Sequence, residues 1–318
     1  MLWVVIGHSF LGSFEQGPVW ENVLCKFAYS FHMPLFMLVS GWLFYRTRLS
    51  ANMSIGGGKL NSSRWNYWQI VKDKAIRLLL PGLLFSIISY GLKWVFPSEI
   101  SRQVGLKVND IIYMFLYPYD NPFREFWFIA TLFWLFLLTP LWKFVLRQVW
   151  MKWSMLVVLV VVHFWHPSLE LLCIGRVFSY SVWFYLGLLV SEVDFVDRFL
   201  SKQMWWTLLA GVAIYAMGWV LHPFVTTIGG ITLSFGLALI ADRFIPKLFY
   251  GFRNYTYQIF LMGILAQMFV KIMNRHVSMP YIGAYLFCLM AGLYVPVLVS
   301  KVIEKIDWKP LSLCVGLK

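Results

Sequence analysis

Two histidines lie within apolar stretches near the start of the chain. His8 is in WVVIGHSF, residues 3–10, and His32 is in FHMPLFMLVSGWLF, residues 31–44. Ionisable side chains are costly inside a membrane and commonly mark a functional site. Imidazole, with a reference pKa of about 6.5, is the usual base for taking a proton from a hydroxyl group. The residue types indicate proton-transfer chemistry, although capping of a carbonyl group or contact with interfacial water would explain either histidine alone.

The two histidines are expected to lie at similar depth. His8 falls about one helical turn before the end of an apolar segment at 1–11, and His32 falls about one and a half turns after the start of the next, at 27–45. Consecutive membrane helices run antiparallel, so both positions lie toward the same face. The spacing predicts a shared polar site, and a proton relay is the alternative use of such a pair.

The second apolar segment contains residues that disturb or tighten helix packing. Pro34 cannot donate to the helical hydrogen-bond ladder, so a kink or widened turn that leaves carbonyl groups free is expected beside His32. Ser40 is followed by Gly41, which predicts a surface for close helix packing. Proline and glycine are also common in membrane helices that have no functional role there.

Cationic and aromatic residues near the ends of later apolar segments are candidate binding groups. Arg77 lies inside the start of the third segment, three residues after Lys74. A cation at this position suits an anionic ligand, although an arginine there also commonly extends to the membrane surface. Arg176 lies near the outer end of the sixth segment, and Trp127 is an expected interface anchor at the start of the fourth.

Composition indicates an all-α integral membrane protein. Of the 318 residues, 60% are hydrophobic and 13% are charged, which is about half the charged fraction of a typical soluble domain. A helix needs about 20 apolar residues to cross a bilayer, and most apolar segments approach that length. Residues 1–318 are therefore predicted to form a single membrane domain, a bundle of about ten transmembrane helices within the lipid bilayer. The predicted segments are 1–11, 27–45, 75–96, 126–146, 149–165, 174–190, 204–221, 224–241, 255–273 and 281–303.

The first segment is too short to cross the membrane. As a helix its residues span about 16 Å, whereas the hydrocarbon core is about 30 Å thick. The segment also lacks the basic start and the small-residue cleavage site of a signal peptide. The first helix is therefore expected to be truncated, through a shortened sequence or a start codon assigned too far downstream.

The excess of basic residues indicates how the chain is oriented. Lysine and arginine concentrate in 46–77, 142–152, 242–254 and after 300, which are alternate connections and so lie on one side. The opposite connections, such as 97–125, are nearly neutral. By the positive-inside rule the basic side is cytoplasmic, and both termini are expected there. The net charge of +13 is attributed to this topology, and nucleic acid is not an expected partner.

The sequence shows no motif for a bound metal, nucleotide or redox cofactor. The four cysteines are scattered without a C-x-x-C pair, which argues against a metal or redox site. The stretch SIGGGKLNSS, residues 54–63, lacks both the first glycine of a P-loop and the serine or threonine after its lysine. No metal and no bound cofactor are therefore expected.

Five short motifs, taken in order, resemble the acyltransferase-3 family of membrane O-acyltransferases, in particular its branch that acetylates bacterial surface carbohydrates. The second-helix motif at 31–44 is the most specific, and the resemblance extends from the start of the chain to residue 265. The motifs are WVVIGHS, FHMPLFMLVSGWLF, KAIRLLLPGL, FWFIATLFWLFLL and GRVFSYSVWFYLG.

The chain departs from the family pattern at two positions. The family's arginine or lysine about three turns before the first-helix histidine would precede Met1. Gly263 stands where a later family helix often has a histidine, so no role of that histidine carries over.

The resemblance implies an enzyme that transfers an acyl group to a carbohydrate hydroxyl in the bacterial inner membrane, with His8 as the catalytic residue. The implied donor is cytoplasmic acyl-CoA, expected to be acetyl-CoA, and charge matching assigns its phosphates to Lys74 and Arg77. The implied acceptor is a cell-surface glycan or a lipid-linked sugar. The residues expected to line the site or bind substrate are His32, Ser40, Trp127 and Arg176.

Transport is the alternative function. A proton-coupled transporter or flippase for a polysaccharide intermediate would use His8 and His32 as a proton path. No inverted repeat of the kind found in many transporters is visible in the sequence, which favours the enzyme.

Overall fold

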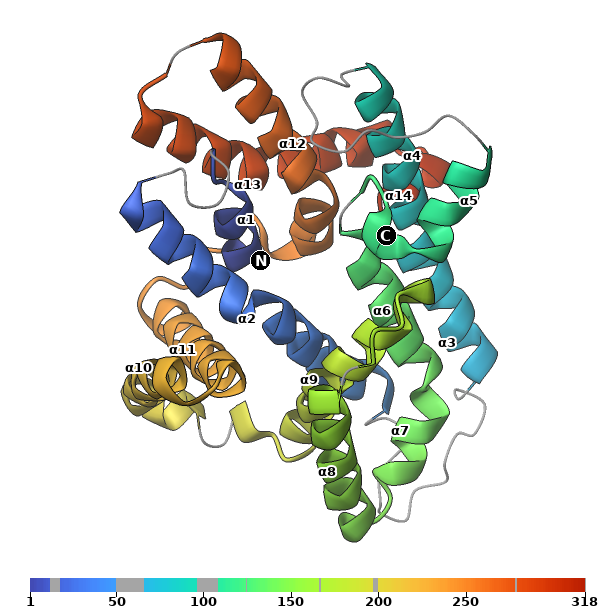
Figure 1. The fold of residues 1–318 in the computed structure, drawn as a ribbon, viewed down its shortest axis with the longest axis vertical. Helices are drawn as coiled ribbons and strands as arrows, with labels where there is room; N and C mark the ends of the chain where they lie inside the picture. Colours follow the sequence, from blue (N-terminus) through green and yellow to red (C-terminus); the bar gives the residue numbers. More distant parts are fainter. Residues whose placement is uncertain are drawn as a thin grey trace. The chain divides into compact units, whose positions relative to one another are not determined.

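The structure, a computed structural model, describes residues 1–11, 18–49, 66–95, 108–123, 125–165, 167–196, 200–277 and 279–317 (Figure 1). Within these ranges the chain is almost entirely helical and contains no strand. The helices form two compact units, a first unit of Met1–Leu35 with Val196–Lys318 and a second unit of Phe36–Phe195.

The first unit joins the N-terminal helices to the C-terminal part of the chain. It contains the first part of α2, and two short 3-10 turns precede α10 and α12. Its elements are α1 (Leu2–His8), α2 (Val19–Phe44) up to Leu35, η8 (Ser201–Gln203), α10 (Met204–Leu221), α11 (Pro223–Phe244), η9 (Arg253–Tyr255), α12 (Thr256–His276), α13 (Tyr281–Ile306) and α14 (Lys309–Cys314).

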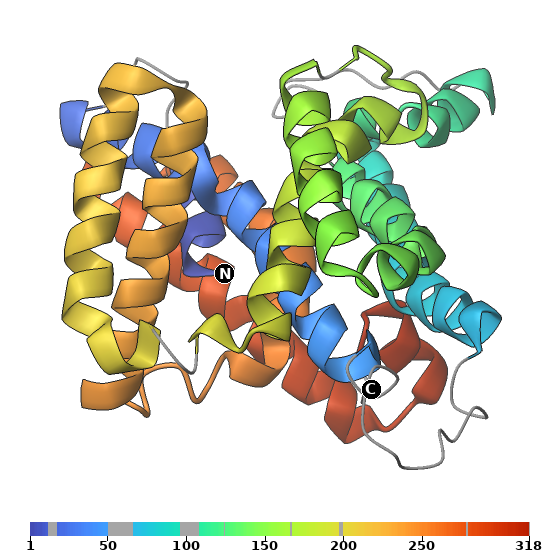
Figure 2. The same cartoon turned by 90° about the horizontal axis from the view of Figure 1, so that it is seen from below.

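Helices α10 and α11 form an antiparallel pair held at very short range, drawn in yellow and orange in Figure 2. A Cβ atom added at Gly218 would lie 2.2 Å from the Thr226 nitrogen, and one added at Gly229 would lie 2.2 Å from the Tyr215 nitrogen. Small residues at a membrane helix interface let the backbones approach closely. Glycines on both helices therefore set the distance between them.

The second unit contains the rest of α2 and the middle of the chain. Two five-residue π turns widen its helices, one after α2 and one after α3. Its other elements are η1 (Tyr45–Leu49), α3 (Tyr67–Lys74), η4 (Ala75–Leu79), α4 (Leu80–Val95), α5 (Val108–Leu116), η5 (Pro118–Asp120), α6 (Phe126–Leu137), α7 (Thr139–Val145), α8 (Val149–Trp165), η6 (Leu171–Cys173) and α9 (Ile174–Glu192).

The second half of α2 packs directly against α9. A Cβ atom at Gly41 would lie 2.0 Å from the Phe184 carbonyl oxygen, and one at Gly187 would lie 2.0 Å from the Leu38 carbonyl oxygen. The close-packing surface predicted at Gly41 is therefore confirmed, and glycines on both helices make it possible.

The all-α membrane class is confirmed, but fewer helices qualify as spans than the ten predicted. Seven of the described helices are long and apolar enough to cross a membrane, and the pair α6 and α7, bent by 51°, adds an eighth if it is one span. Pro140 lies in the first turn of α7 at this bend and lacks a backbone N–H. The segments at 1–11 and 149–165 form helices of only 7 and 17 residues. The seven are Val19–Leu49, Tyr67–Val95, Leu171–Glu192, Met204–Leu221, Pro223–Phe244, Arg253–His276 and Tyr281–Ile306.

Helix α2 continues through Pro34, and a neighbouring helix compensates for the missing donor. In an α-helix the N–H of residue 34 would bond to the carbonyl of Ser30, four residues earlier. Instead, Thr227 Oγ1 of α11 donates to the Ser30 oxygen at 2.8 Å. The expectation of a free carbonyl beside His32 is therefore wrong, because α11 occupies the carbonyl that Pro34 would leave open.

Candidate active site

The structure brings His8 and His32 together in the first unit. Their ring centroids lie 6.5 Å apart with the rings perpendicular. His8 is the last residue of α1, whereas His32 lies within α2. Tyr29 joins them, with its ring centroid 5.7 Å from that of His8 and 4.9 Å from that of His32.

The two histidines have different surroundings. His32 is 4% exposed, and its Nδ1 lies 2.9 Å from the Ala28 carbonyl oxygen. A carbonyl can only accept, so Nδ1 carries the proton and Nε2 of a neutral His32 is left as an acceptor. His8 is half-buried, and its Nδ1 lies 3.3 Å from the Tyr29 hydroxyl. The more open His8 is thus better placed to meet a substrate, and the more buried His32 is fixed by its own helix.

Tyr29 was not identified from the sequence. It lies three residues before His32, a spacing that puts two side chains on one face of a helix. This spacing from His32 was the feature of the sequence that could have identified Tyr29 as a site residue.

Two polar residues of α12 also reach the site and were not identified. Gln267 Nε2 donates to the Val5 carbonyl at 2.9 Å and to Ser9 Oγ at 2.9 Å. Lys271 Nζ donates to the His8 carbonyl at 2.8 Å. Their spacing of four residues inside an apolar segment was the signal in the sequence.

Gly263 has a packing role in this chain. A Cβ atom there would lie 2.9 Å from the Gly292 carbonyl oxygen of α13. Position 263, where the resembling family often has histidine, therefore has no room for a larger side chain unless α12 and α13 move apart.

Arg176 and Trp127, both expected at the site, lie together in the second unit. The guanidinium carbon of Arg176 is 5.5 Å from the Trp127 ring centroid and 5.0 Å from that of Tyr119. A cation over aromatic faces is stabilised by their quadrupoles. Ser40 is half-buried in α2 of the same unit, directly before the close contact at Gly41.

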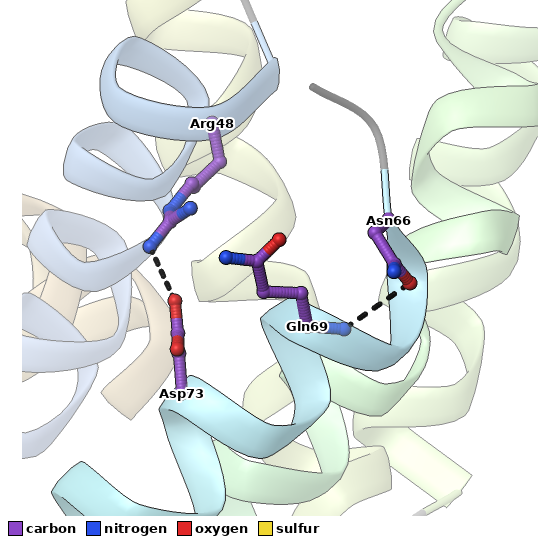
Figure 3. A network of polar contacts seen from close by, with 4 residues as sticks. All are labelled: Arg48, Asn66, Gln69 and Asp73. Carbon is purple, nitrogen blue, oxygen red and sulfur yellow. Dashed lines mark hydrogen bonds and ion pairs between the residues drawn. The ribbon is translucent and has the colours of Figure 1, made fainter. Parts of the chain in front are cut away.

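Lys74 and Arg77 belong to a basic region where α3 passes into η4. The Lys74 ammonium lies 3.9 Å from the ring centroid of Phe136, whereas Arg77 is exposed. In the same region Arg48 pairs with Asp73 at 2.9 Å, and α3 starts at Asn66, whose Oδ1 accepts from the Gln69 amide at 3.3 Å (Figure 3). Arg77 is thus more accessible than Lys74, which lies against aromatic rings. The rest of the predicted basic loop, residues 50–65, lies outside the described residues.

No group of three or more His, Cys, Asp or Glu side chains that could hold a metal ion occurs in the described ranges. All four cysteines are free thiols, and three of them, Cys25, Cys173 and Cys288, are buried.

Apolar helices of membrane-spanning length define a polytopic membrane protein, and the half-buried His8 of α1 lies beside the buried His32 of α2. A model of the family Acyl_transf_3, an acyltransferase domain, matches residues 1–301, and the chain belongs to this family of membrane acyltransferases.

Among characterised proteins, the chain is similar to the nodulation protein NolL of Mesorhizobium japonicum. The two are 30% identical over 139 residues, which is 42% of this chain and 31% of NolL. The match therefore spans about a third of that relative's length. No solved structure matches the chain.

Proposed function

We propose that the protein transfers an acyl group from acyl-CoA to a hydroxyl group of a carbohydrate, with His8 as the general base. The observation that carries this proposal is the contact of His8 with Tyr29 and His32 inside apolar helices of an acyltransferase-family chain. Ionisable side chains within membrane helices are costly and commonly mark a functional site, which supports a role for the two histidines.

The proposed step transfers the acyl group directly from sulfur to the acceptor oxygen. His8 takes the proton of the acceptor hydroxyl while the oxygen attacks the thioester carbonyl carbon. A carbon–oxygen bond forms, the carbon–sulfur bond breaks, and its electron pair leaves with sulfur. The thiolate then takes the proton from His8, which returns to its neutral form. Positioned general bases of this kind contribute about 10²–10⁴-fold in rate.

For the donor we propose acyl-CoA, specifically acetyl-CoA, bound through its phosphates. Arg77 is exposed in a region that also contains Arg48 and Lys74, with Asp73 offsetting one of these charges. Arginine pairs well with phosphate because its planar guanidinium makes two parallel hydrogen bonds. This supports Arg77 as the principal phosphate ligand and Lys74 as a secondary one.

For the acceptor we propose a cell-surface glycan or a lipid-linked sugar, with the protein in the bacterial inner membrane. The proposed substrate-lining residues are His32 in the first unit and Ser40, Trp127 and Arg176 in the second. Both termini are proposed to be cytoplasmic, a proposal supported by the alternation of basic connections along the sequence.

The test uses inverted membrane vesicles supplied with radiolabelled acetyl-CoA. Wild-type vesicles should incorporate label into a carbohydrate fraction, and mild alkali should release it, because esters of hydroxyl groups are alkali-labile and amides are not. His8→Ala should lose incorporation. His222→Asn is the matched control, because His222 caps α11 with its side chain and asparagine is a preferred N-cap. Incorporation by His8→Ala at the wild-type level would overturn the assignment.

The contact between His8 and His32 also suits the transport alternative. A transporter would move a saccharide-lipid between leaflets with proton uptake and would form no ester. Histidine-dependent translocation without any labelled ester would replace the enzyme proposal with this one.

A further inference from the structure

We propose that Lys271 and Gln267 of α12 are positioning residues that hold the carbonyl end of α1 and thereby fix His8. The proposal rests on the catalytic role proposed for His8, and it adds two residues that act on His8 through its backbone.

Helix α1 cannot satisfy its own C-terminus. The last four carbonyl groups of any α-helix lack an intrahelical donor, and an unpaired backbone group in a membrane costs several kcal/mol. Ser9 supplies part of the need, with its hydroxyl donating to Val5 at 2.7 Å and its amide donating to Ile6 at 3.1 Å. The carbonyl of His8 accepts from a residue outside α1.

Helix α12 provides that donor. Lys271 Nζ donates to the His8 carbonyl at 2.8 Å, and Gln267 Nε2, one turn earlier, donates to the Val5 carbonyl at 2.9 Å. Gln267 is 1% exposed, so its amide is committed to this contact. Two side chains on one face of α12 thus bind two carbonyls, three residues apart, in the last turn of α1.

Helix α13 leaves room for the contact between Gln267 and α1, because it has a glycine at position 292. A Cβ atom at Gly292 of α13 would lie 2.6 Å from Gln267 Nε2 and 2.8 Å from Val5 Cγ1. Any larger residue there would push Gln267 away from α1. The contact therefore involves three helices and is built into their packing.

The charge of Lys271 suits its place. The C-terminus of a helix carries a partial negative charge, and a cation there is stabilising. A lysine near the end of a membrane helix commonly extends toward water, whereas the Lys271 ammonium binds the backbone of the proposed catalytic residue. The hydrogen bond from Lys271 to the His8 carbonyl therefore supports a positioning role for Lys271.

The experiment measures the reactivity of His8 as well as activity. Diethylpyrocarbonate, which modifies histidine, is added to purified protein in lipid nanodiscs, and modified peptides are quantified by mass spectrometry. The proteins compared are wild type, Lys271→Met, Lys271→Arg and Gln267→Leu. Trypsin cleavage after the exposed Lys26 separates the peptide with His8 from the peptide with His32. Lys301→Met, at an exposed lysine of α13, is the matched control.

Lys271→Met should raise the rate of His8 modification several-fold and lower kcat by about 10²-fold, the cost of misplacing a reacting group by about 1 Å. The KM for acyl-CoA should stay within twofold of wild type. Lys271→Arg should restore both readouts, because a guanidinium can donate to the same carbonyl, and Lys301→Met should match wild type.

Unchanged His8 modification in Lys271→Met would overturn the proposal. If that variant does not fold, Gln267→Leu gives the same comparison, and unchanged His8 reactivity in it would also overturn the proposal. Failure of the proposed function would give a different result. His8→Ala would then retain acyl transfer, while Lys271→Met would still change the rate at which His8 is modified.

Discussion

The hydroxyl of Thr227 donates at 2.8 Å to the carbonyl of Ser30, the group that the proline at position 34 leaves without its helical donor. One turn of α11 further on, a Cβ atom at Gly230 would lie 2.2 Å from the Phe31 ring. Helix α11 thus bonds to the carbonyl that lacks a helical donor in α2, directly beside the histidine pair.

Thr227→Val should lower the free energy of unfolding by about 1–3 kcal/mol, because it removes the donor to the part-buried Ser30 carbonyl. Thermal unfolding in detergent measures the change. Thr232→Val is the matched control, because the Thr232 hydroxyl donates to a carbonyl of its own helix, that of Ile228. In a Pro34→Ala background the effect of Thr227→Val should shrink, since the alanine N–H can take the Ser30 carbonyl. An effect of equal size in both backgrounds would contradict this account.

His8→Ala should abolish acyl transfer and leave the folded amount almost unchanged. Loss of a general base costs about 10²–10⁴-fold in rate, which is complete loss in a cell-based glycan assay. His32→Ala should impair activity less, because a positioning or substrate-binding role is expected there. Normal acylation by His8→Ala together with loss in His32→Ala would move the base to α2, and normal acylation by both would leave the histidines with a structural role only.

Tyr29→Phe should reduce kcat by up to tenfold. The change removes the hydroxyl at 3.3 Å from His8 Nδ1 and keeps the ring beside both histidines. A single hydrogen bond contributes about 0.5–1.5 kcal/mol, and about 1.4 kcal/mol corresponds to tenfold. Steady-state kinetics in vesicles measure it, and a loss as large as that of His8→Ala would instead make Tyr29 a catalytic group.

Arg77→Ala should raise the KM for acyl-CoA about tenfold with little change in kcat. A hydrogen bond to a charged group is worth about 1.5–3 kcal/mol, and the effect should weaken at high salt, which screens exposed charges. Arg253→Ala, another exposed arginine on the predicted cytoplasmic side, is the control. A change in kcat alone would exclude the phosphate-binding role.

Cysteine labelling should find the C-terminus cytoplasmic. The background carries Cys314→Ser, because the other three cysteines are buried. In intact cells a membrane-impermeant maleimide should label a cysteine at Asn109 and not one at Lys309, and lysis should expose both. Labelling of the Lys309 probe in intact cells would reverse the orientation.

The sequence was informative where residue type and local spacing predict a feature. Membrane class, the pairing of His8 with His32 and the tight packing at Gly41 all follow from residue type and spacing, and the structure shows each of them. It was uninformative where two distant segments meet. Nothing in α2 reveals that Thr227 will occupy the Ser30 carbonyl, and nothing in α1 reveals Lys271, because both contacts join residues about 200 or more positions apart.

The glycine-lined pair α10 and α11 has a consequence for biosynthesis. His222 alone separates the two helices, so closing the hairpin costs little chain entropy. Domains generally form as they are synthesised, N-terminal parts first, and this pair is complete before α12 leaves the ribosome. The hairpin can therefore enter the bilayer already paired. Helix α12, which bears Gln267 and Lys271, is synthesised later, so the carbonyl groups at the end of α1 receive these two donors only after the hairpin has formed.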